Sequence, residues 1–471
     1  MTNLPSASLY GTTQFPSTLE TYLRYVPRGP AQSASLYARV LRSLRAIPHT
    51  ALVRETRAGK FWLRAAFLTL IVGILADSPF LLVAGISALA FVGLGWLWDA
   101  VSLWGLRYSR RFDVAGAPAL GSLPETRAFL GETVTLTLEL SNQKPLPLMA
   151  VEIEDIFPTA LPVDGARVDV NRATQRGEFR SFWMPGIFQR LTRRYTVTCA
   201  QRGYHDFGPA KLTTGDGAGL FTRTATLQGA QCLIVYPRLY TAAELRLPAK
   251  NPFGERVSKE RLFEDPLRTA GIRDWQPGDS LRRIHWPATA RHQQMLSRLY
   301  EPSEESQIML FVNASALERH WEGVVPELVE RTLSVAGSLA ALCAEQRLPV
   351  GLIVNAYWPG SDQAMRLLPG RSPHQLTRIL EMLAAVELPI RPIETQLLRE
   401  APTLPWGATL VVVTAIAHTA LLEALRELAH ARRKVVLFTL AEAPPQERLP
   451  GVQVYHLPHL VEDIIAPVEV A

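Results

Sequence analysis

Residues 271–291 read GIRDWQPGDSLRRIHWPATAR, and this stretch separates two parts of the chain that have different hydrophobic patterns. Pro277 and Gly278 favour a tight turn, because proline presets φ and glycine accepts positive φ. Asp279 can then cap a short helix, which we expect to begin just after it and to end near Pro287. The stretch is also rich in tryptophan and arginine, which are enriched at the energetic centres of protein interfaces.

We therefore predict a functional surface on residues 271–291, called the signature segment below, whose residues organise the local structure first and make contacts second. Its candidate residues are Arg273, Trp275, Asp279, Arg282, Arg283, Trp286 and Arg291. The alternative is a structural cluster in which the arginines form salt bridges and the tryptophans pack as lids. A catalytic or metal pair of His285 and His292 is the weaker interpretation, because no third ligand is spaced with them.

The segment resembles a bacterial family known as domain of unknown function number fifty-eight, through the pattern G-x-R-x-[YW]-x-P-G-D-x-x-R-x-I-x-W-x-x-x-A-R. The matching positions are Gly271, Arg273, Trp275, Pro277, Gly278, Asp279, Arg282, Ile284, Trp286, Ala290 and Arg291. The resemblance covers the chain from about residue 61 onward. It implies two membrane helices, a β domain, a von Willebrand factor A-like domain and a MoxR-type AAA+ ATPase as partner.

Basic residues are concentrated at the N-terminus. Residues 1–64 of the 471 include nine Arg or Lys and two acidic residues, so this segment has a net charge of +7. The whole chain has a net charge of +6, so the remaining residues together carry −1. A nucleic-acid-binding domain would carry its own basic surface, so we expect no nucleic-acid partner. The three cysteines are far apart, which predicts neither a disulfide framework nor a zinc site and suits a reducing compartment. We expect no cofactor.

Residues 1–60 are predicted to form a basic cytoplasmic arm. Apolar and basic positions alternate with helical periodicity between residues 35 and 47. This pattern predicts an amphipathic helix that lies on an anionic lipid surface. A helix docked on the protein with its basic face in solvent is the alternative.

Residues 61–106 predict a transmembrane helical hairpin with spans at 61–76 and 80–98. The second span has 19 residues without a charge, which is about 28 Å of helix and close to the thickness of the hydrocarbon layer. Basic residues flank both ends, so the positive-inside rule places the N-terminus and the later domains in the cytoplasm, on a two-pass protein of the cytoplasmic (inner) membrane. The alternative is one true span, which would export the rest of the chain.

The two remaining domains differ in periodicity. Residues 112–240 alternate apolar and polar positions in short runs, which predicts an antiparallel β-sandwich. Residues 241–300 form a linker that contains the signature segment. Residues 301–471 alternate uniformly apolar strands with helices, which predicts a doubly wound α/β domain with a parallel sheet. This is the region that the resemblance identifies as von Willebrand A-like.

In an A-like domain the first strand should end in D-x-S-x-S, whose oxygens bind Mg²⁺. Here that position reads Asn313-Ala-Ser315-Ala-Leu317, and a later strand ends at Thr414 without an aspartate. Because Mg²⁺ prefers carboxylate oxygens, we predict a vestigial site at Asn313, Ser315 and Thr414 that holds no metal. A purely structural polar cluster is the simpler interpretation of these residues.

No serine or cysteine lies in a nucleophile elbow, and the sequence suggests no partner for His418, so we expect no enzymatic activity. The expected function is that of a membrane-anchored cytoplasmic scaffold or adaptor, which works with a MoxR-type AAA+ ATPase in the assembly or maturation of other proteins. Two alternatives stay open. One is a metal-dependent, adhesion-type A domain, and the other is a membrane-bound hydrolase that depends on His285 or His292.

Overall fold

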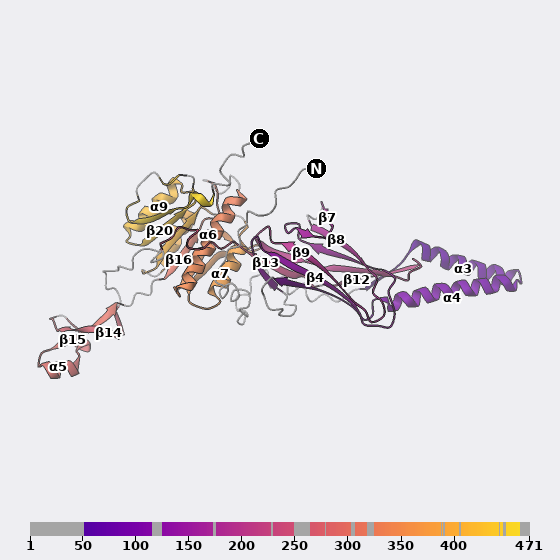
Figure 1. The fold of residues 1–471 in the computed structure, drawn as a ribbon, viewed down its shortest axis with the longest axis horizontal. Coiled ribbons are helices and arrows are strands. Elements are labelled where there is room, and N and C mark those ends of the chain that lie inside the picture. Colours follow the sequence, from indigo (N-terminus) through magenta and orange to yellow (C-terminus); the bar gives the residue numbers. More distant parts are fainter. Residues whose placement is uncertain are drawn as a thin grey trace. The chain divides into compact units, whose positions relative to one another are not determined.

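The computed structural model describes most of the chain beyond residue 50 (Figure 1). The described residues are 51–114, 125–172, 176–227, 229–248, 264–277, 279–302, 307–317, 325–387, 389, 391–404, 407–441, 443–445 and 449–461. The helix predicted at residues 35–47 lies outside them. The chain divides into two compact units, of which the first comprises Met1–Leu239 with two short later segments. The two units are described separately.

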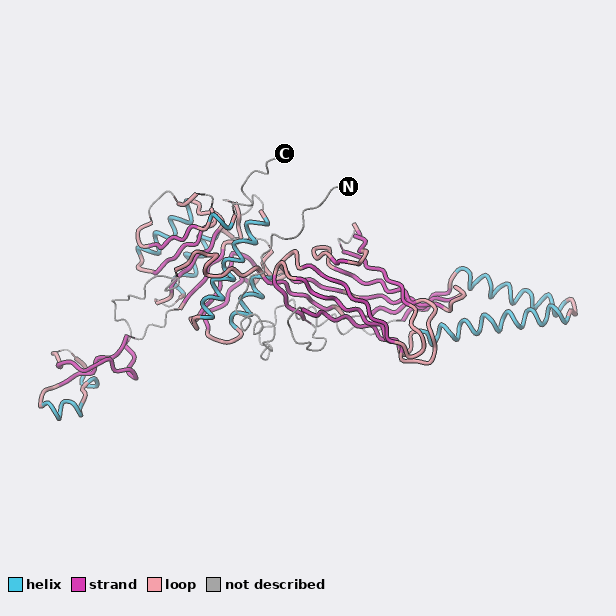
Figure 2. The backbone as a smooth tube through the Cα atoms, in the orientation of Figure 1, coloured by secondary structure: helices cyan, strands magenta, loops and turns pink. Residues whose placement is uncertain are grey.

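The first unit begins its helical part with α3 (Arg57–Leu75), which packs along α4 (Pro79–Ser102) as a hairpin. Thr56 caps α3 by accepting a hydrogen bond from the Gly59 amide at 3.0 Å, and Pro79 begins α4, where its missing N–H is tolerated. The two helices run side by side (Figure 2). Both are long and apolar enough to cross a membrane, and most of their large apolar side chains are exposed. The predicted hairpin of apolar helices is therefore confirmed.

The same unit contains a β-sandwich of antiparallel sheets with one parallel strand pair. The first sheet has the order β1 (Ala51–Glu55), β12 (Phe221–Leu227), β11 (Ala210–Gly215), β5 (Val151–Phe157), β8 (Arg176–Trp183) and β7 (Val168–Asn171). The second has the order β2 (Leu106–Val114), β4 (Thr133–Asn142), β9 (Arg190–Thr198) and β6 (Val163–Asp164). A third sheet has the order β10 (Gly203–Phe207), β13 (Gln231–Tyr236) and β3 (Glu125–Phe129), and its β13–β3 pair is parallel.

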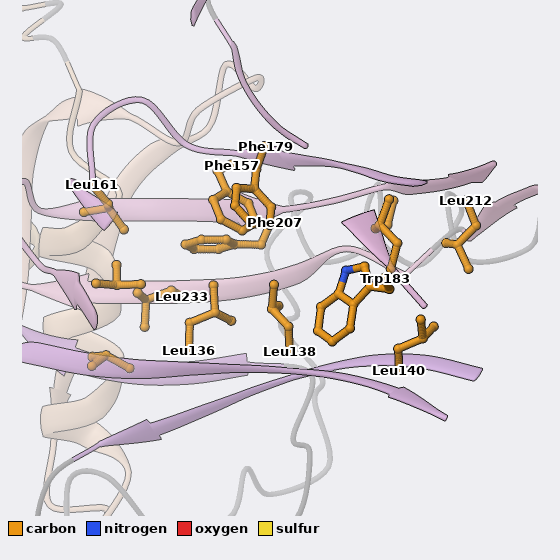
Figure 3. Close-up of a cluster of buried hydrophobic side chains, with 14 of the residues drawn as sticks. Leu136, Leu138, Leu140, Phe157, Leu161, Phe179, Trp183, Phe207, Leu212 and Leu233 are labelled. Carbon is orange, nitrogen blue, oxygen red and sulfur yellow. The ribbon is translucent and has the colours of Figure 1, made fainter. Parts of the chain in front are cut away.

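The core of the sandwich follows from the alternation in β4. Leu136, Leu138 and Leu140 all point inward and are fully buried, while the residues between them are partly exposed. They face aromatic side chains of the first sheet, including Phe157 and Trp183 (Figure 3). Full burial of each leucine contributes roughly 1.5–3 kcal/mol. The predicted β-sandwich is confirmed, and its period-two pattern is what fixes the register.

The helical hairpin is continuous with both main sheets of the sandwich. β1 precedes α3 and pairs with β12 in the first sheet, whereas β2 follows α4 and pairs with β4 in the second. We did not anticipate β1, because its five residues (ALVRE) lie within the N-terminal segment that we predicted to form a basic arm. Its position means that the chain enters the hairpin from one sheet and leaves it into the other.

In the second unit, β14 (Glu264–Asp274) pairs in antiparallel fashion with β15 (Leu296–Pro302). Two short helices lie between these strands in the chain, η1 (Leu281–Arg283) and α5 (Trp286–His292). The prediction of a single short helix that ends near Pro287 is therefore wrong. Pro287 lies in the first turn of α5, where the amide hydrogen that proline lacks would have no helical partner.

The second unit also holds a six-stranded mixed sheet. Its order is β18 (Ala364–Gly370), β17 (Val350–Tyr357), β16 (Ile308–Val312), β19 (Thr409–Thr414), β20 (Lys434–Thr439) and β21 (Val452–His456). The helices are α6 (Pro326–Glu345), α7 (Gln375–Ala384), α8 (Ile393–Glu400) and α9 (Thr419–His430), with short 3₁₀ turns η2 (Ala401–Thr403) and η3 (Pro458–Leu460).

Five of these strands are parallel and follow the order of a doubly wound fold. α8 and α9 pack on alternating strand residues such as Phe311, Val412 and Leu437, and α6 contacts β16, β17 and β19 outside that cluster. The α/β prediction is confirmed. The expectation of a purely parallel sheet is wrong at one edge, where β18 runs antiparallel to β17. Since β16 lies between β17 and β19, the strand order reverses at β16, and ligands of such sheets bind at the carboxyl ends next to that reversal.

Candidate functional site

A hydrogen-bonded turn organises the signature segment. Asp279 accepts a hydrogen bond from the Arg273 guanidinium at 2.7 Å and one from the Gln276 amide at 3.0 Å. These two bonds, the first above all, hold the pKa of the Asp279 carboxyl below its usual value. The expected role of Asp279 as a helix cap is wrong, because Ser280 caps η1 and His285 caps α5. Asp279 instead ties the turn to the end of β14.

The two histidines of this region occupy ordinary structural and surface positions. His285 Nδ1 accepts the Ala288 amide at 3.1 Å, so that nitrogen is used as the cap of α5. His292 is exposed in the last turn of α5. Across the described ranges, no group of three or more His, Cys, Asp or Glu side chains is placed to hold a metal ion. The geometry therefore offers no support for a metal or catalytic pair of histidines.

The signature segment exposes apolar side chains on a small folded frame. Trp286 is 64% exposed and Leu281 is 66% exposed. Ile284, which lies between them in the sequence, is buried and anchors the segment. Trp275 and Arg283 are half-buried, while Arg282 and Arg291 are exposed. Of the seven predicted residues, Arg282, Trp286 and Arg291 thus reach solvent, whereas the half-buried ones are Arg273, Trp275, Asp279 and Arg283.

The charge of this surface is positive. Between residues 271 and 298 the chain has five arginines and two aspartates, a net charge of +3. One of those aspartates, Asp279, is paired with Arg273. Exposed arginine and tryptophan side chains together form a surface suited to an acidic partner with an apolar contact point.

The vestigial metal position lies at the carboxyl edge of the parallel sheet, where the strand order reverses. Asn313 follows β16 and donates from Nδ2 to Oγ1 of Thr414, the last residue of β19, at 3.0 Å. Ser315 is close by, since its amide donates to Asn313 Oδ1 at 3.1 Å. The structure therefore brings together the three residues that the sequence placed at this site, and all three are buried.

A fourth residue, Asn355 in β17, fills the centre of this cluster. Its Nδ2 lies 2.9 Å from Asn313 Oδ1, 3.0 Å from the Arg391 carbonyl oxygen and 3.4 Å from Ser315 Oγ. Its Oδ1 accepts the Ala314 amide at 2.7 Å. An amide nitrogen thus lies among the oxygens that would have to face a cation. The cluster is neutral and internally bonded, and it lacks the carboxylate that Mg²⁺ favours.

Sequence reasoning did not identify Asn355 or Glu394. Asn355 is 42 residues from Asn313, although an asparagine inside an otherwise apolar strand was a usable signal. Glu394 Oε2 lies 3.2 Å from His418 Nε2, so His418 has a partner that sequence spacing could not reveal. This pair joins the start of α8 to the cap of α9 and is a structural contact.

With this geometry established, the chain can be compared with known proteins. Residues 271–470 match the family described as "Protein of unknown function DUF58". The resemblance is thereby confirmed over residues 271–470, which contain both the signature segment and the α/β sheet. Its expected extension from about residue 61 stays a prediction. A relative is "Uncharacterized protein YeaD" of Bacillus subtilis (strain 168), which is 26% identical over 221 residues. The match covers 46% of this chain and 51% of YeaD, so the chain spans about half the length of that relative.

Solved structures give weaker likenesses. A ScaB type I cohesin from Pseudobacteroides cellulosolvens has 13% identity and a TM-score of 0.16, and the match covers 23% of this chain and 86% of the cohesin. A non-cellulosomal cohesin from Archaeoglobus fulgidus has 8% identity and a TM-score of 0.16, over 27% and 91% of the two chains. With scores this low, neither likeness carries an argument about function.

Proposed function

We propose that this chain is a membrane-anchored cytoplasmic scaffold or adaptor that binds a protein partner through the signature segment. The apolar hairpin of α3 and α4 anchors it in the cytoplasmic membrane, with both ends of the hairpin on the cytoplasmic side. The DUF58 resemblance suggests a MoxR-type AAA+ ATPase as the partner and protein assembly or maturation as the process. The A-like assignment of the α/β sheet belongs to the same proposal.

One observation carries the proposal: Trp286 and Leu281 are exposed on a segment that is otherwise well ordered by hydrogen bonds. The Arg273–Asp279 ion pair fixes the turn, and the His285 amide donates to the Leu296 carbonyl of β15 at 2.8 Å. A large indole held in solvent on a fixed frame is typical of an interface anchor. The positive charge around it favours an acidic surface on the partner, which would raise the association rate.

The two alternative functions receive less support. A metal-dependent A domain needs a cation where the Asn355 amide nitrogen makes its hydrogen bonds. A hydrolase that uses His285 as a base needs a ring nitrogen that can accept a proton, whereas Nδ1 already accepts the Ala288 amide as the cap of α5. Calorimetric titration of the full-length protein with Mg²⁺ and Mn²⁺ tests the first alternative, and micromolar binding would revive it.

Site-specific photocrosslinking in the host membrane tests the proposal. We would replace Trp286 by the photoreactive amino acid benzoylphenylalanine and, as a matched control, replace Leu368, which is 58% exposed on the edge strand β18. We expect a crosslink to an AAA+ ATPase from position 286 alone, and its loss when Arg282→Ala/Arg283→Ala is added. No crosslink from position 286, or equal crosslinks from both positions, would contradict the assignment of the partner surface.

A further inference from the structure

Large apolar side chains form a second exposed group, at the end of the sandwich that adjoins the hairpin. This group, called the apolar rim, consists of Trp104, Met149, Met184, Ile187 and Phe188, which are 58% to 71% exposed. Trp104 follows α4, and the others lie in two loops, 143–149 and 184–189, that connect strands of the sandwich. Their position in the fold is fixed by contacts with the hairpin.

Lys144 ties the first loop to the end of α4. Its ammonium group is buried and donates to the carbonyl oxygens of Ser102 and Trp104, the latter at 2.8 Å. The Gln143 amide also donates to the Gly105 carbonyl at 2.8 Å. Cations that bind terminal carbonyls stabilise a helix C-terminus. The loop therefore lies at the level of the last turn of α4.

The second loop is bonded to the first. The Phe188 amide donates to the Lys144 carbonyl at 3.2 Å, and the Leu148 amide donates to the Pro185 carbonyl at 3.0 Å. Phe188 has φ of 47°, a left-handed conformation that is unfavourable for an aromatic residue. The fold thus maintains a strained backbone while it leaves the ring of Phe188 in solvent.

The connection between β11 and β12, residues 216–220, and strand β12 itself contact the sides of both helices. Arg223 of β12 pairs with the buried Asp99 of α4 at 3.3 Å. Thr56, which caps α3, donates to the Leu220 carbonyl at 2.7 Å. Gly217 lies against Met149, close enough that a Cβ there would be 3.0 Å from Met149 Cγ. These contacts fix the position of the hairpin relative to the apolar rim.

The length of α4 places the apolar rim at a defined depth. Its 24 residues span about 36 Å, whereas the hydrocarbon layer is about 30 Å thick. If α4 begins at the far boundary of that layer, Ser102 lies about 6 Å beyond the near boundary, and the headgroup layer on each side is roughly 5–8 Å thick. The end of α4 and the loops bonded to it therefore fall within the headgroup layer.

We propose that the apolar rim enters the headgroup layer of the same phospholipid bilayer that the hairpin crosses, so that the sandwich rests directly on the membrane. This inference depends on the proposed anchoring by α3 and α4. Tryptophan is enriched at this depth, and the other rim side chains are of the apolar type that interfacial segments bury there. Arg107, which is exposed nearby, adds attraction to anionic lipids.

The test uses fluorescent labels on single introduced cysteines in the full-length protein. Cys199, Cys232 and Cys343 are buried, so labelling will favour an exposed new cysteine. The variants are Ile187→Cys in the rim and Val170→Cys as the matched control. Val170 is similarly exposed, but it lies in β7, which pairs with the end of β8 away from Trp183. A third variant, Ile86→Cys in α4, reports on the hairpin.

Each variant would be labelled with an environment-sensitive fluorophore and reconstituted into phosphatidylcholine–phosphatidylglycerol vesicles. We expect lipids with a nitroxide on the headgroup to quench the label at 187 strongly and the label at 170 weakly. We expect lipids with a nitroxide on the acyl chain to quench the label at 86. Met184→Cys should repeat the result for 187, which protects the test against a local folding defect.

The outcomes separate the two proposals. If the label at 86 is quenched while the labels at 187 and 184 behave like the label at 170, the rim does not enter the headgroup layer, but the hairpin still crosses the bilayer. If the label at 86 is also unquenched, the anchoring and the rim proposals are both wrong.

Discussion

Asn313→Ala is the substitution that most directly measures the neutral cluster at the edge of the α/β sheet. The wild-type side chain donates to Thr414 Oγ1 at 3.0 Å and accepts from the Ser315 amide at 3.1 Å and from Asn355 Nδ2 at 2.9 Å. Alanine removes all three bonds, and it leaves the buried Ser315 amide without this acceptor. Asn355 keeps its bond to the Arg391 carbonyl.

The expected decrease in the local free energy of unfolding follows from the number of hydrogen bonds that Asn313→Ala removes. A buried hydrogen bond contributes about 0.5–1.5 kcal/mol, so three bonds together give about 3 kcal/mol. Ser315→Ala is the matched control, because the Ser315 hydroxyl accepts from Asn355 Nδ2 at 3.4 Å. Removal of this long bond should lower the local free energy of unfolding by less than about 1 kcal/mol.

Hydrogen exchange of the full-length protein in detergent, followed by mass spectrometry of peptides from β16, β17 and β19, gives the local free energy of opening. A loss of about 3 kcal/mol corresponds to an increase in the opening constant of roughly a hundredfold for Asn313→Ala. Exchange that stays at the wild-type rate would refute the claim that this amide network holds the strand edge together. Equal effects of Asn313→Ala and Ser315→Ala would refute the assignment of its centre.

Three other predictions concern charged groups. The pKa of Asp279 is lowered from 3.8 in the folded chain, so its ion pair with Arg273 should stabilise the signature segment above pH 3.8. This stabilisation should be lost as the pH falls through the lowered pKa. Hydrogen exchange of the backbone amides in the signature segment should show the loss in the wild type but not in Asp279→Asn. Burial lowers the pKa of Lys144 from 10.5 to about 8. Between pH 8 and pH 10.5 the unfolded chain therefore binds more protons than the folded chain, so the free energy of unfolding should rise with pH in this range. Chemical denaturation should show this rise in the wild type but not in Lys144→Met. Asn313→Asp restores the carboxylate of the metal motif, yet calorimetry should detect no micromolar Mg²⁺ binding, since the Asn355 amide nitrogen still lies among the oxygens.

The regular elements could be predicted from the sequence because their burial follows a simple period. The leucines of β4 alternate with polar residues, whereas β19 is apolar from Leu410 to Val413, so the local pattern alone distinguishes a half-buried strand from a fully buried one. The apolar helices of the hairpin follow from composition in the same way. These features need no knowledge of distant residues.

The parts that could not be predicted depend on contacts between distant residues or on local competition. The Asn355 side chain bonds to residues 36 to 42 positions away, and Lys144 looks like an ordinary surface residue until α4 ends beside it. From the sequence, Pro287 could end one helix or begin another. In the structure it lies in the first turn of α5, because His285 caps that helix. The depth of the apolar rim required both the length of α4 and the bonds of Lys144.

The central claim is that the hairpin crosses the membrane and leaves the folded domains on the cytoplasmic side. Cysteine accessibility in intact cells tests it most directly, with Asp77→Cys in the turn between α3 and α4 and Val170→Cys in the sandwich. A membrane-impermeant thiol reagent should label position 77 from outside in intact cells and should label position 170 only after the membrane is permeabilised. Labelling of position 170 in intact cells, or of both positions only after permeabilisation, would contradict the account.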